Sequence, residues 1–190
     1  QFEIPHDFAV RKITFIDTPG HEAFLKMRSR GASVADIALL VVAVDDGVMP
    51  QTKESIEHIK QANLPFIVVL TKADVQASDP ERVKGQLLKA GVMLEGLGGD
   101  VPFLSVSAKT GTGIKELLEL ILLVGALHEI SKDENIPFSG VVIESWVDPR
   151  SGSPATIIVR NGKLRVGDTI SCEGEKAKVK ALISFDQKRV

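Results

Sequence analysis

Four apolar runs separated by helix-like segments constrain the fold of this chain more than any other feature. The runs cover Lys12–Ile16, Ile37–Val44, Phe66–Leu70 and Phe103–Val106. Strands that are apolar along nearly their whole length are typical of a parallel sheet covered on both faces. Helices are expected at Glu22–Arg30, Thr52–Ala62, Pro80–Ala90 and Gly113–Leu127. This alternation predicts an α/β fold with a doubly wound parallel sheet and right-handed crossovers.

The pattern changes after residue 130. A polar linker at residues 131–136 leads into short strand-like runs without helices. These cover Phe138–Trp146, Ala155–Arg160, Lys163–Val166, Thr169–Cys172 and Ala177–Ser184, and Asn161-Gly162 indicates a two-residue hairpin turn. We therefore expect an α/β domain at residues 1–130 that lacks its N-terminal part. The linker follows, and residues 137–190 form the incomplete start of an all-β barrel.

Composition limits the classes of protein that this chain can represent. The net charge of -2 gives no bulk basic signal for nucleic acid, so we expect no DNA partner and at most a local RNA contact. The single cysteine, Cys172, cannot form an internal disulfide and fits a reducing compartment. The longest apolar run, Ile37–Val44, has eight residues and is too short to cross a membrane.

The first chemically unusual segment directly follows the first apolar run and reads Asp17, Thr18, Pro19, Gly20, His21. A carboxylate at a strand end can reach a hydrated Mg²⁺. The glycine N–H can approach a phosphate oxygen without side-chain obstruction, and the histidine can orient a water for in-line attack on that phosphate. A plain turn, with the aspartate capping a helix, is the structural alternative.

Two further segments follow later strands. In Thr71-Lys72-Ala73-Asp74 the aspartate can accept both the ring N–H and the exocyclic amine of guanine, a donor pair that adenine does not offer. The lysine stem can lie over the purine while its charge stays hydrated. After the next strand come Ser107, Ala108 and Lys109, where the Ala108 N–H can donate to the guanine carbonyl oxygen. Each segment alone is also compatible with an ordinary loop.

The order of these three segments favours a nucleotide site. All three lie at the carboxyl ends of successive expected strands, where ligands bind in open α/β sheets. Two strand–helix units separate Asp17 from Asp74, and one separates Asp74 from Ser107. This is the order that a guanine-nucleotide site needs.

The sequence also resembles a known family, the translational GTPases, and within it bacterial-type translation initiation factor 2. The resemblance covers nearly the whole chain. It rests on DTPGHEAF, MRSRGASVADIALLVVAVDDGVMPQT, TKAD, LGGD, VSAKTGTGI and NGKLRVGD. Elongation factors share the Asp-x-Pro-Gly-His core but typically continue with an Asp-Tyr-like pair, where this chain has Glu22-Ala23-Phe24.

The resemblance implies a role for each candidate residue. Asp17 would hold Mg²⁺ through water, within a nucleotide-binding segment that includes Thr18 and Pro19. Gly20 would meet the γ-phosphate, and His21 would be the catalytic residue that positions the attacking water. Residues 21–31 would form the second switch. The remaining positions would read guanine: Thr71, Lys72, Asp74, Ser107, Ala108 and Lys109. Thr71 departs from the family, which most often has Asn there, and a hydroxyl offers fewer donors than an amide.

The implied function is that of a GTPase initiation factor. Such a protein binds and hydrolyses GTP on the ribosome while it promotes initiator tRNA placement and subunit joining. Its cofactors would be GTP or GDP and Mg²⁺. Its partners would be both ribosomal subunits with their rRNA, and initiator tRNA through a domain outside this chain. The location would be the cytoplasm, or an organelle matrix. The alternatives are an elongation-factor-type GTPase and a non-catalytic module with the same fold.

One expected element is missing from the sequence. The phosphate loop G-x-x-x-x-G-K-[ST] does not occur, and the first glycine is Gly20. That loop supplies the backbone cradle, the phosphate-binding lysine and a hydroxyl ligand to Mg²⁺. We therefore expect this chain to be a piece of a longer protein, which alone neither binds GTP tightly nor hydrolyses it.

Overall fold

A computed structural model of the chain describes residues 2–6, 9–18, 34–75, 79–131, 133–147 and 152–184. The chain divides into two compact units. The first contains residues 15–130, and the second combines residues 1–14 with residues 131–190. The boundary at residue 130 thus separates a unit that contains helices from a unit whose described regular elements are strands.

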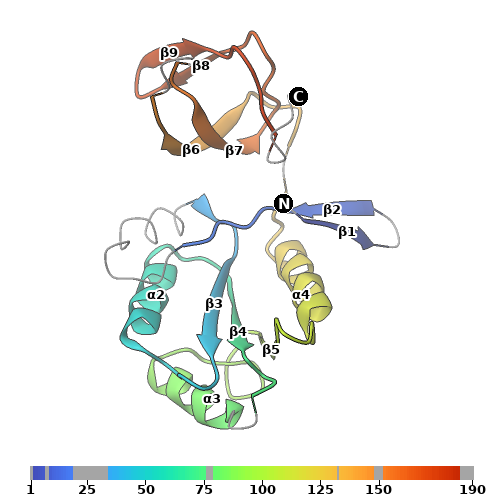
Figure 1. Ribbon diagram of the computed structural model, residues 1–190, viewed down its shortest axis with the longest axis vertical. Helices are drawn as coiled ribbons and strands as arrows, with labels where there is room; N and C mark the ends of the chain where they lie inside the picture. Colours follow the sequence, from blue (N-terminus) through green and yellow to red (C-terminus); the bar gives the residue numbers. More distant parts are fainter. Residues whose placement is uncertain are drawn as a thin grey trace. The chain divides into compact units, whose positions relative to one another are not determined.

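A parallel sheet forms the centre of the first unit (Figure 1). Its strands are β3 (Ala38–Ala43), β4 (Phe66–Thr71) and β5 (Phe103–Ser105), in the order β3-β4-β5. Ala38 lies opposite Phe66, and Val68 lies opposite Phe103. Three of the four apolar runs therefore form parallel strands as predicted, and their carboxyl ends share one edge of the sheet.

The helices of this unit are α2 (Pro50–Gln61), α3 (Pro80–Lys89) and α4 (Ile114–Leu127). These match three of the four expected helices to within two residues. α3 begins where its sequence indicates, because the Asp79 carboxylate accepts the Arg82 N–H at 3.0 Å and Pro80 occupies the first turn. The fourth expected helix, Glu22–Arg30, lies outside the described residues.

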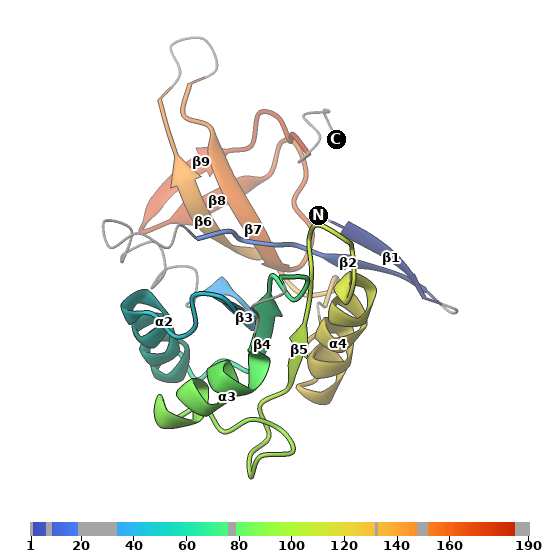
Figure 2. The same cartoon turned by 60° about the horizontal axis from the view of Figure 1, so that its bottom comes forward.

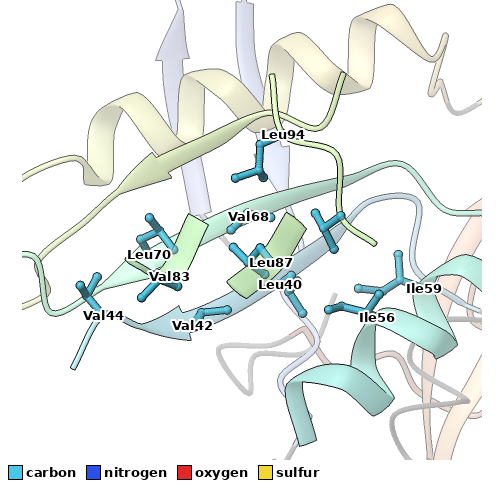
Figure 3. Close-up of a cluster of buried hydrophobic side chains, with 11 residues drawn as sticks. Leu40, Val42, Val44, Ile56, Ile59, Val68, Leu70, Val83, Leu87 and Leu94 are labelled. Carbon is cyan, nitrogen blue, oxygen red and sulfur yellow. The ribbon is translucent and has the colours of Figure 1, made fainter. Parts of the chain in front are cut away.

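The core of the first unit lies between the sheet and the helices α2 and α3. Figure 3 shows Val83 and Leu87 of α3 pointing toward the side chains of β3 and β4. α4 lies on the other side of the sheet (Figures 1 and 2). Val68 and Leu70 of β4 belong to the core between the sheet and the helices α2 and α3, whereas Ile67 and Val69 are buried outside that core. β4 is thus buried on both faces, which explains its uninterrupted apolar sequence.

The expectation for the first apolar run is wrong. The strand there is β2 (Ala9–Ile13), and the following residues 14–18 have no regular secondary structure. β2 pairs antiparallel with β1 (Phe2–His6), with Phe2 opposite Ile13, and not with the parallel sheet. Phe15 is 42% exposed, so its run is not the doubly covered strand that its composition indicated. Apolar composition alone cannot identify which partner strand a segment pairs with.

The described part of the second unit contains three antiparallel pairs, of which β1–β2 is one. β6 (Ser139–Ser145) pairs with β7 (Ala155–Asn161), and β8 (Thr169–Cys172) pairs with β9 (Glu175–Lys178). The turn between β8 and β9 is Glu173-Gly174, where both residues have positive φ (50° and 91°). Such values are those of the two-residue turn that matches strand twist.

Three details of this unit correct the expectations. Asn161-Gly162 is not a hairpin turn, because β7 pairs with β6 and the run Lys163–Val166 forms no strand. Instead the Gly162 N–H donates to the Asp133 carbonyl at 2.8 Å, and a Cβ there would lie 2.6 Å from the Ile136 carbonyl oxygen. Close backbone approach explains this glycine. The last strand is Glu175–Lys178, not Ala177–Ser184.

Among the described residues, no helix has both the length and the apolar character needed to span a bilayer.

Candidate nucleotide site

Two of the candidate segments meet at the carboxyl edge of the parallel sheet. Lys72 and Asp74 belong to the turn after β4, and Ser107 belongs to the loop after β5. Backbone hydrogen bonds join these connections: the Val106 N–H donates to Leu70 at 2.8 Å, and the Ala73 N–H donates to Val106 at 3.2 Å. The register of β4 and β5 therefore sets the spacing between the two segments.

The central contact of the site is a hydrogen bond from the Ser107 hydroxyl to the Asp74 carboxylate, with Oγ and Oδ1 2.6 Å apart. Ser107 is 1% exposed, and its Oγ also accepts the Thr110 N–H at 3.2 Å. Its backbone N–H donates to Thr112 at 3.0 Å. A buried serine thus orients an exposed aspartate. The carboxylate of that aspartate is accessible as a hydrogen-bond acceptor for a ligand.

The electrostatic surroundings keep this aspartate ionised. The Ser107 hydroxyl lowers the pKa of Asp74, and the Asp74 backbone N–H and the charge of Lys109 act in the same direction. Hydrogen bonding to the charged form is the cause expected to lower a carboxyl pKa. Asp74 is therefore an acceptor at neutral pH, which suits a partner that offers two adjacent donors.

Lys72 has an unusual backbone conformation and two acidic partners. Its φ of 59° lies in the left-handed region, which costs a residue with a side chain about 1–2 kcal/mol. Its Nζ lies 2.7 Å from Asp45 Oδ2 and 3.3 Å from Asp46 Oδ2. The hydrogen bond to Asp45 raises the pKa of Lys72, with Asp46 adding to the effect. The same pair lowers the pKa of Asp45.

Asp45 and Asp46 do not stand out as site residues in the sequence. They follow β3 directly, and the only available signal is that β3 ends at the same sheet edge as β4 and β5. The Val44 N–H donates to the Thr71 carbonyl at 3.0 Å, which holds the ends of β3 and β4 together. The Thr71 hydroxyl has no hydrogen-bond partner among the residues that the structure describes.

The remaining guanine-reading candidates are also in the loop after β5. Ala108 and Lys109 are exposed and belong to the turn that the Gly111 N–H closes on the Ser107 carbonyl at 2.8 Å. Within the described parts of the chain, the Ala108 N–H donates no hydrogen bond. An exposed backbone donor beside Asp74 can therefore serve a ligand carbonyl.

The first candidate segment is only partly described. Asp17 is exposed and Thr18 is half-buried, and neither forms a hydrogen bond or ion pair with the residues of the other two segments that the structure describes. Pro19, Gly20 and His21 lie outside the described residues. An exposed carboxylate can bind a hydrated Mg²⁺ through water, so Asp17 is compatible with that role.

An open hollow of about 390 Å³ lies beside β3 and the start of α2. Val41 faces it from β3 with 58% of its surface exposed. The walls of the hollow do not include Lys72, Asp74 or Ser107, but they include Asp46, which contacts Lys72. Its walls are Val41, Val42, Ala43, Asp46, Gly47, Met49, Gln51 and Thr52.

Comparison with known protein families assigns the chain to a class. The model of the elongation factor Tu GTP binding domain matches residues 3–125, and that of elongation factor G domain 2 matches residues 137–190. The chain therefore belongs to the family of the elongation factor Tu GTP-binding domain, the translational GTPases. The predicted fold class, a GTPase-type α/β domain followed by a β domain, is confirmed.

Within that family the chain is similar to translation initiation factor IF-2. It is 51% identical over 94% of its length to IF-2 from Syntrophomonas wolfei, of which it covers 20%. It is 47% identical over its whole length to IF-2 from Rubrobacter xylanophilus, of which it covers 27%. The predicted resemblance to bacterial-type initiation factor 2 is thus confirmed, and the chain spans about a quarter of these relatives.

Solved structures show the same architecture. Elongation factor SelB from Methanococcus maripaludis, in complex with the GTP analogue GPPNHP, has a TM-score of 0.71 at 27% identity, and the match covers 92% of this chain and 39% of that one. GDP-bound aIF5B from Aeropyrum pernix has a TM-score of 0.70 at 27% identity, covering 88% and 34%. Structural neighbours thus include both elongation-type and initiation-type factors.

Proposed function

We propose that the protein carrying this chain is a translation initiation factor that binds and hydrolyses GTP on the ribosome, while it promotes initiator tRNA placement and subunit joining. The identity of about 50% to IF-2 relatives over nearly the whole chain supports initiation. Ribosomal subunits, rRNA and initiator tRNA are the proposed partners, the last through a domain outside this chain. The proposed location is the cytoplasm or an organelle matrix.

One observation carries the proposal for guanine. The Asp74 carboxylate is ionised, exposed and oriented by the buried Ser107 hydroxyl at 2.6 Å. Guanine presents a ring N–H and an exocyclic amine side by side, and a carboxylate accepts both. Adenine would leave those acceptors unpaired, so it would be rejected. Lys72 would lie along the base, and the Ala108 N–H and Lys109 would complete the site together with Thr71.

The phosphate side of the site is assigned on sequence grounds. Asp17 would hold Mg²⁺ through water, with Thr18 and Pro19 in the same nucleotide-binding segment. Gly20 would donate its N–H to the γ-phosphate, and His21 would orient the attacking water. Bound Mg²⁺ would neutralise charge on the phosphates. The 190 residues contain no phosphate loop, so the chain alone should hold GTP weakly and should not hydrolyse it.

The proposed domains keep the boundaries that the sequence indicates. Residues 1–130 would belong to the GTPase domain without its N-terminal part, residues 131–136 to a linker, and residues 137–190 to the incomplete second domain. The division of the chain at residue 130 supports the first boundary. The grouping of residues 1–14 with the second unit does not support the assignment of those residues.

Replacing Asp74 with asparagine tests the guanine proposal. The side-chain amide of the Asp74→Asn variant offers one acceptor fewer and a donor in its place, which suits xanthine because xanthine carries a carbonyl where guanine has its amine. We expect the whole protein with Asp74→Asn to lose at least about a hundredfold in GDP affinity and to gain affinity for XDP. Competition titrations with GDP, XDP and ADP measure this change.

Asp100→Asn is the matched control, since Asp100 is an exposed acid of the same unit. It should leave all three affinities unchanged. If Asp74→Asn binds GDP as tightly as the unmodified protein does, Asp74 does not read the base.

A further inference from the structure

Helix α3 is hydrogen-bonded to the loop that follows β3, here called the 44–48 loop after its residue numbers. Arg82 Nη2 donates to the Val44 carbonyl at 3.0 Å and to the Asp45 carbonyl at 3.1 Å. Gln86 Oε1 accepts the Val48 N–H at 2.9 Å. Both side chains lie on α3, one turn apart, so a rigid helix holds the loop backbone at both ends.

The conformation of the 44–48 loop fits this contact closely. Gly47 has a φ of 75°, and a Cβ there would overlap the Gln86 side-chain amide. The Gly47 N–H donates to the Ala43 carbonyl at 2.8 Å, which closes the turn. The loop is therefore packed against α3, and a side chain at residue 47 would require the Gln86 amide to move as well as a strained backbone.

The same loop carries the acidic partners of Lys72. Asp45 Oδ2 and Asp46 Oδ2 lie 2.7 and 3.3 Å from Lys72 Nζ. A series of direct contacts thus runs from Arg82 and Gln86, through the loop backbone, to Asp45 and on to Lys72. No residue of α3 itself is assigned to the nucleotide site.

We propose that Arg82 and Gln86 are positioning residues for nucleotide binding, which act through the 44–48 loop and Asp45 on Lys72. The inference rests on the proposed function, because Lys72 matters here as the residue that lies along the base. A lysine side chain loses rotamer freedom when it is ordered against a ligand. Anchoring it before the ligand arrives removes that cost from binding.

The simpler interpretation is that these contacts only stabilise the domain. Exposed ion pairs such as Lys72–Asp45 add little to folding stability, so a stability measurement would barely register them. Nucleotide dissociation is a different readout, since it responds to how firmly the site holds Lys72 in the bound state. A purely stabilising role therefore predicts an unchanged rate of nucleotide dissociation in the variants, whereas a positioning role predicts a faster rate.

The test measures dissociation of a fluorescent GDP analogue from the whole protein. Arg82→Met removes the guanidinium and keeps the apolar stem, Gln86→Leu removes the acceptor, and Asp45→Asn removes the charge. Each should accelerate dissociation about two- to tenfold, as for coupled neighbouring residues. Gln86→Glu keeps an acceptor for the Val48 N–H and should restore the slow rate. Lys89→Met on the same helix and Asp100→Asn are the controls and should change nothing.

The double variant Arg82→Met/Asp45→Asn decides whether the contacts form one series. If Arg82 acts through Asp45, the double variant dissociates GDP no faster than Asp45→Asn alone. Additive effects, or single-variant rates equal to those of the controls, overturn the proposal. Should Arg82→Met fail to fold, Gln86→Leu/Asp45→Asn gives the same decision. If the unmodified protein does not prefer GDP to ADP, the proposed function itself fails, and that outcome is separate.

Discussion

At the scale of single residues, the buried Ser107 hydroxyl orients the exposed Asp74 carboxylate. Ser107 is a buried polar residue surrounded by its own loop, and its hydroxyl joins that loop to Asp74. A buried polar group is tolerated only when it is hydrogen-bonded, and Ser107 bonds at both its hydroxyl and its backbone. The arrangement therefore fixes the loop and the acid together.

Ser107→Ala should remove the hydrogen bonds of the hydroxyl to the Asp74 carboxylate and to the Thr110 N–H. The Thr110 N–H would lose its acceptor, which costs on the order of 1 kcal/mol of stability. The pKa of Asp74 should rise toward its ordinary value of 3.8, because its largest lowering contribution is removed. A ¹³C NMR titration of the Asp74 carboxyl measures the pKa, and denaturant unfolding measures the stability.

The pH dependence of this effect has a definite sign. A carboxyl whose pKa is lowered by folding adds stability above its unfolded pKa and loses that stability as the pH falls through its folded pKa. The difference in stability between the unmodified protein and Ser107→Ala should therefore be largest at neutral pH and should shrink below about pH 3.8. Ser105→Ala, at an exposed position of β5, is the control. An unshifted Asp74 pKa in Ser107→Ala would contradict the account.

At the scale of elements, the loop from β5 to α4, which carries Ser107, packs closely against the end of β5. Gly113 precedes α4 with a φ of 77°, and a Cβ there would overlap the Ser105 carbonyl oxygen. Gly111 in the same loop has nearly the same φ, 78°, yet a Cβ there would contact nothing within 4 Å. The two glycines separate the effect of backbone conformation from the effect of close approach.

Gly113→Ala should destabilise the domain more than Gly111→Ala does. Gly111→Ala carries only the left-handed strain, roughly 1 kcal/mol, whereas Gly113→Ala must also move β5 or α4 and should lose about 3 kcal/mol. Denaturant unfolding of the two variants side by side gives the difference. Equal losses would mean that the loop moves freely away from β5.

Elements with a strong local signal were predictable from the sequence. Asp79-Pro80 fixes the start of α3, and uninterrupted apolar runs give β3, β4 and β5. Strand pairing was not predictable in the same way, because it depends on distant segments: Ala9–Ile13 pairs with Phe2–His6, and Asn161-Gly162 contacts the segment around Asp133. The contact between Asp45 and Lys72 was also not predictable, because it forms only when β3 and β4 lie side by side.

At the scale of the whole molecule, the proposed function gives this chain the base side of a nucleotide site. Lys72, Asp74 and Ser107 lie together at one sheet edge, while no phosphate loop occurs in the 190 residues. The chain covers from 17% to 30% of its IF-2 relatives. We therefore expect nucleotide binding to be divided between residues of this chain, which would select the base, and a cradle for the phosphates that this sequence lacks.

The most direct test is a titration of a fluorescent GDP analogue into two samples, the whole protein and the 190-residue chain, with unlabelled GDP or ADP as competitor. We predict submicromolar binding by the whole protein, displaced by GDP and not by ADP, and binding at least about a hundredfold weaker by the chain alone. Displacement by ADP at the same concentration as by GDP would contradict the assignment of the base-reading site. Submicromolar binding by the chain alone would contradict the division of the site.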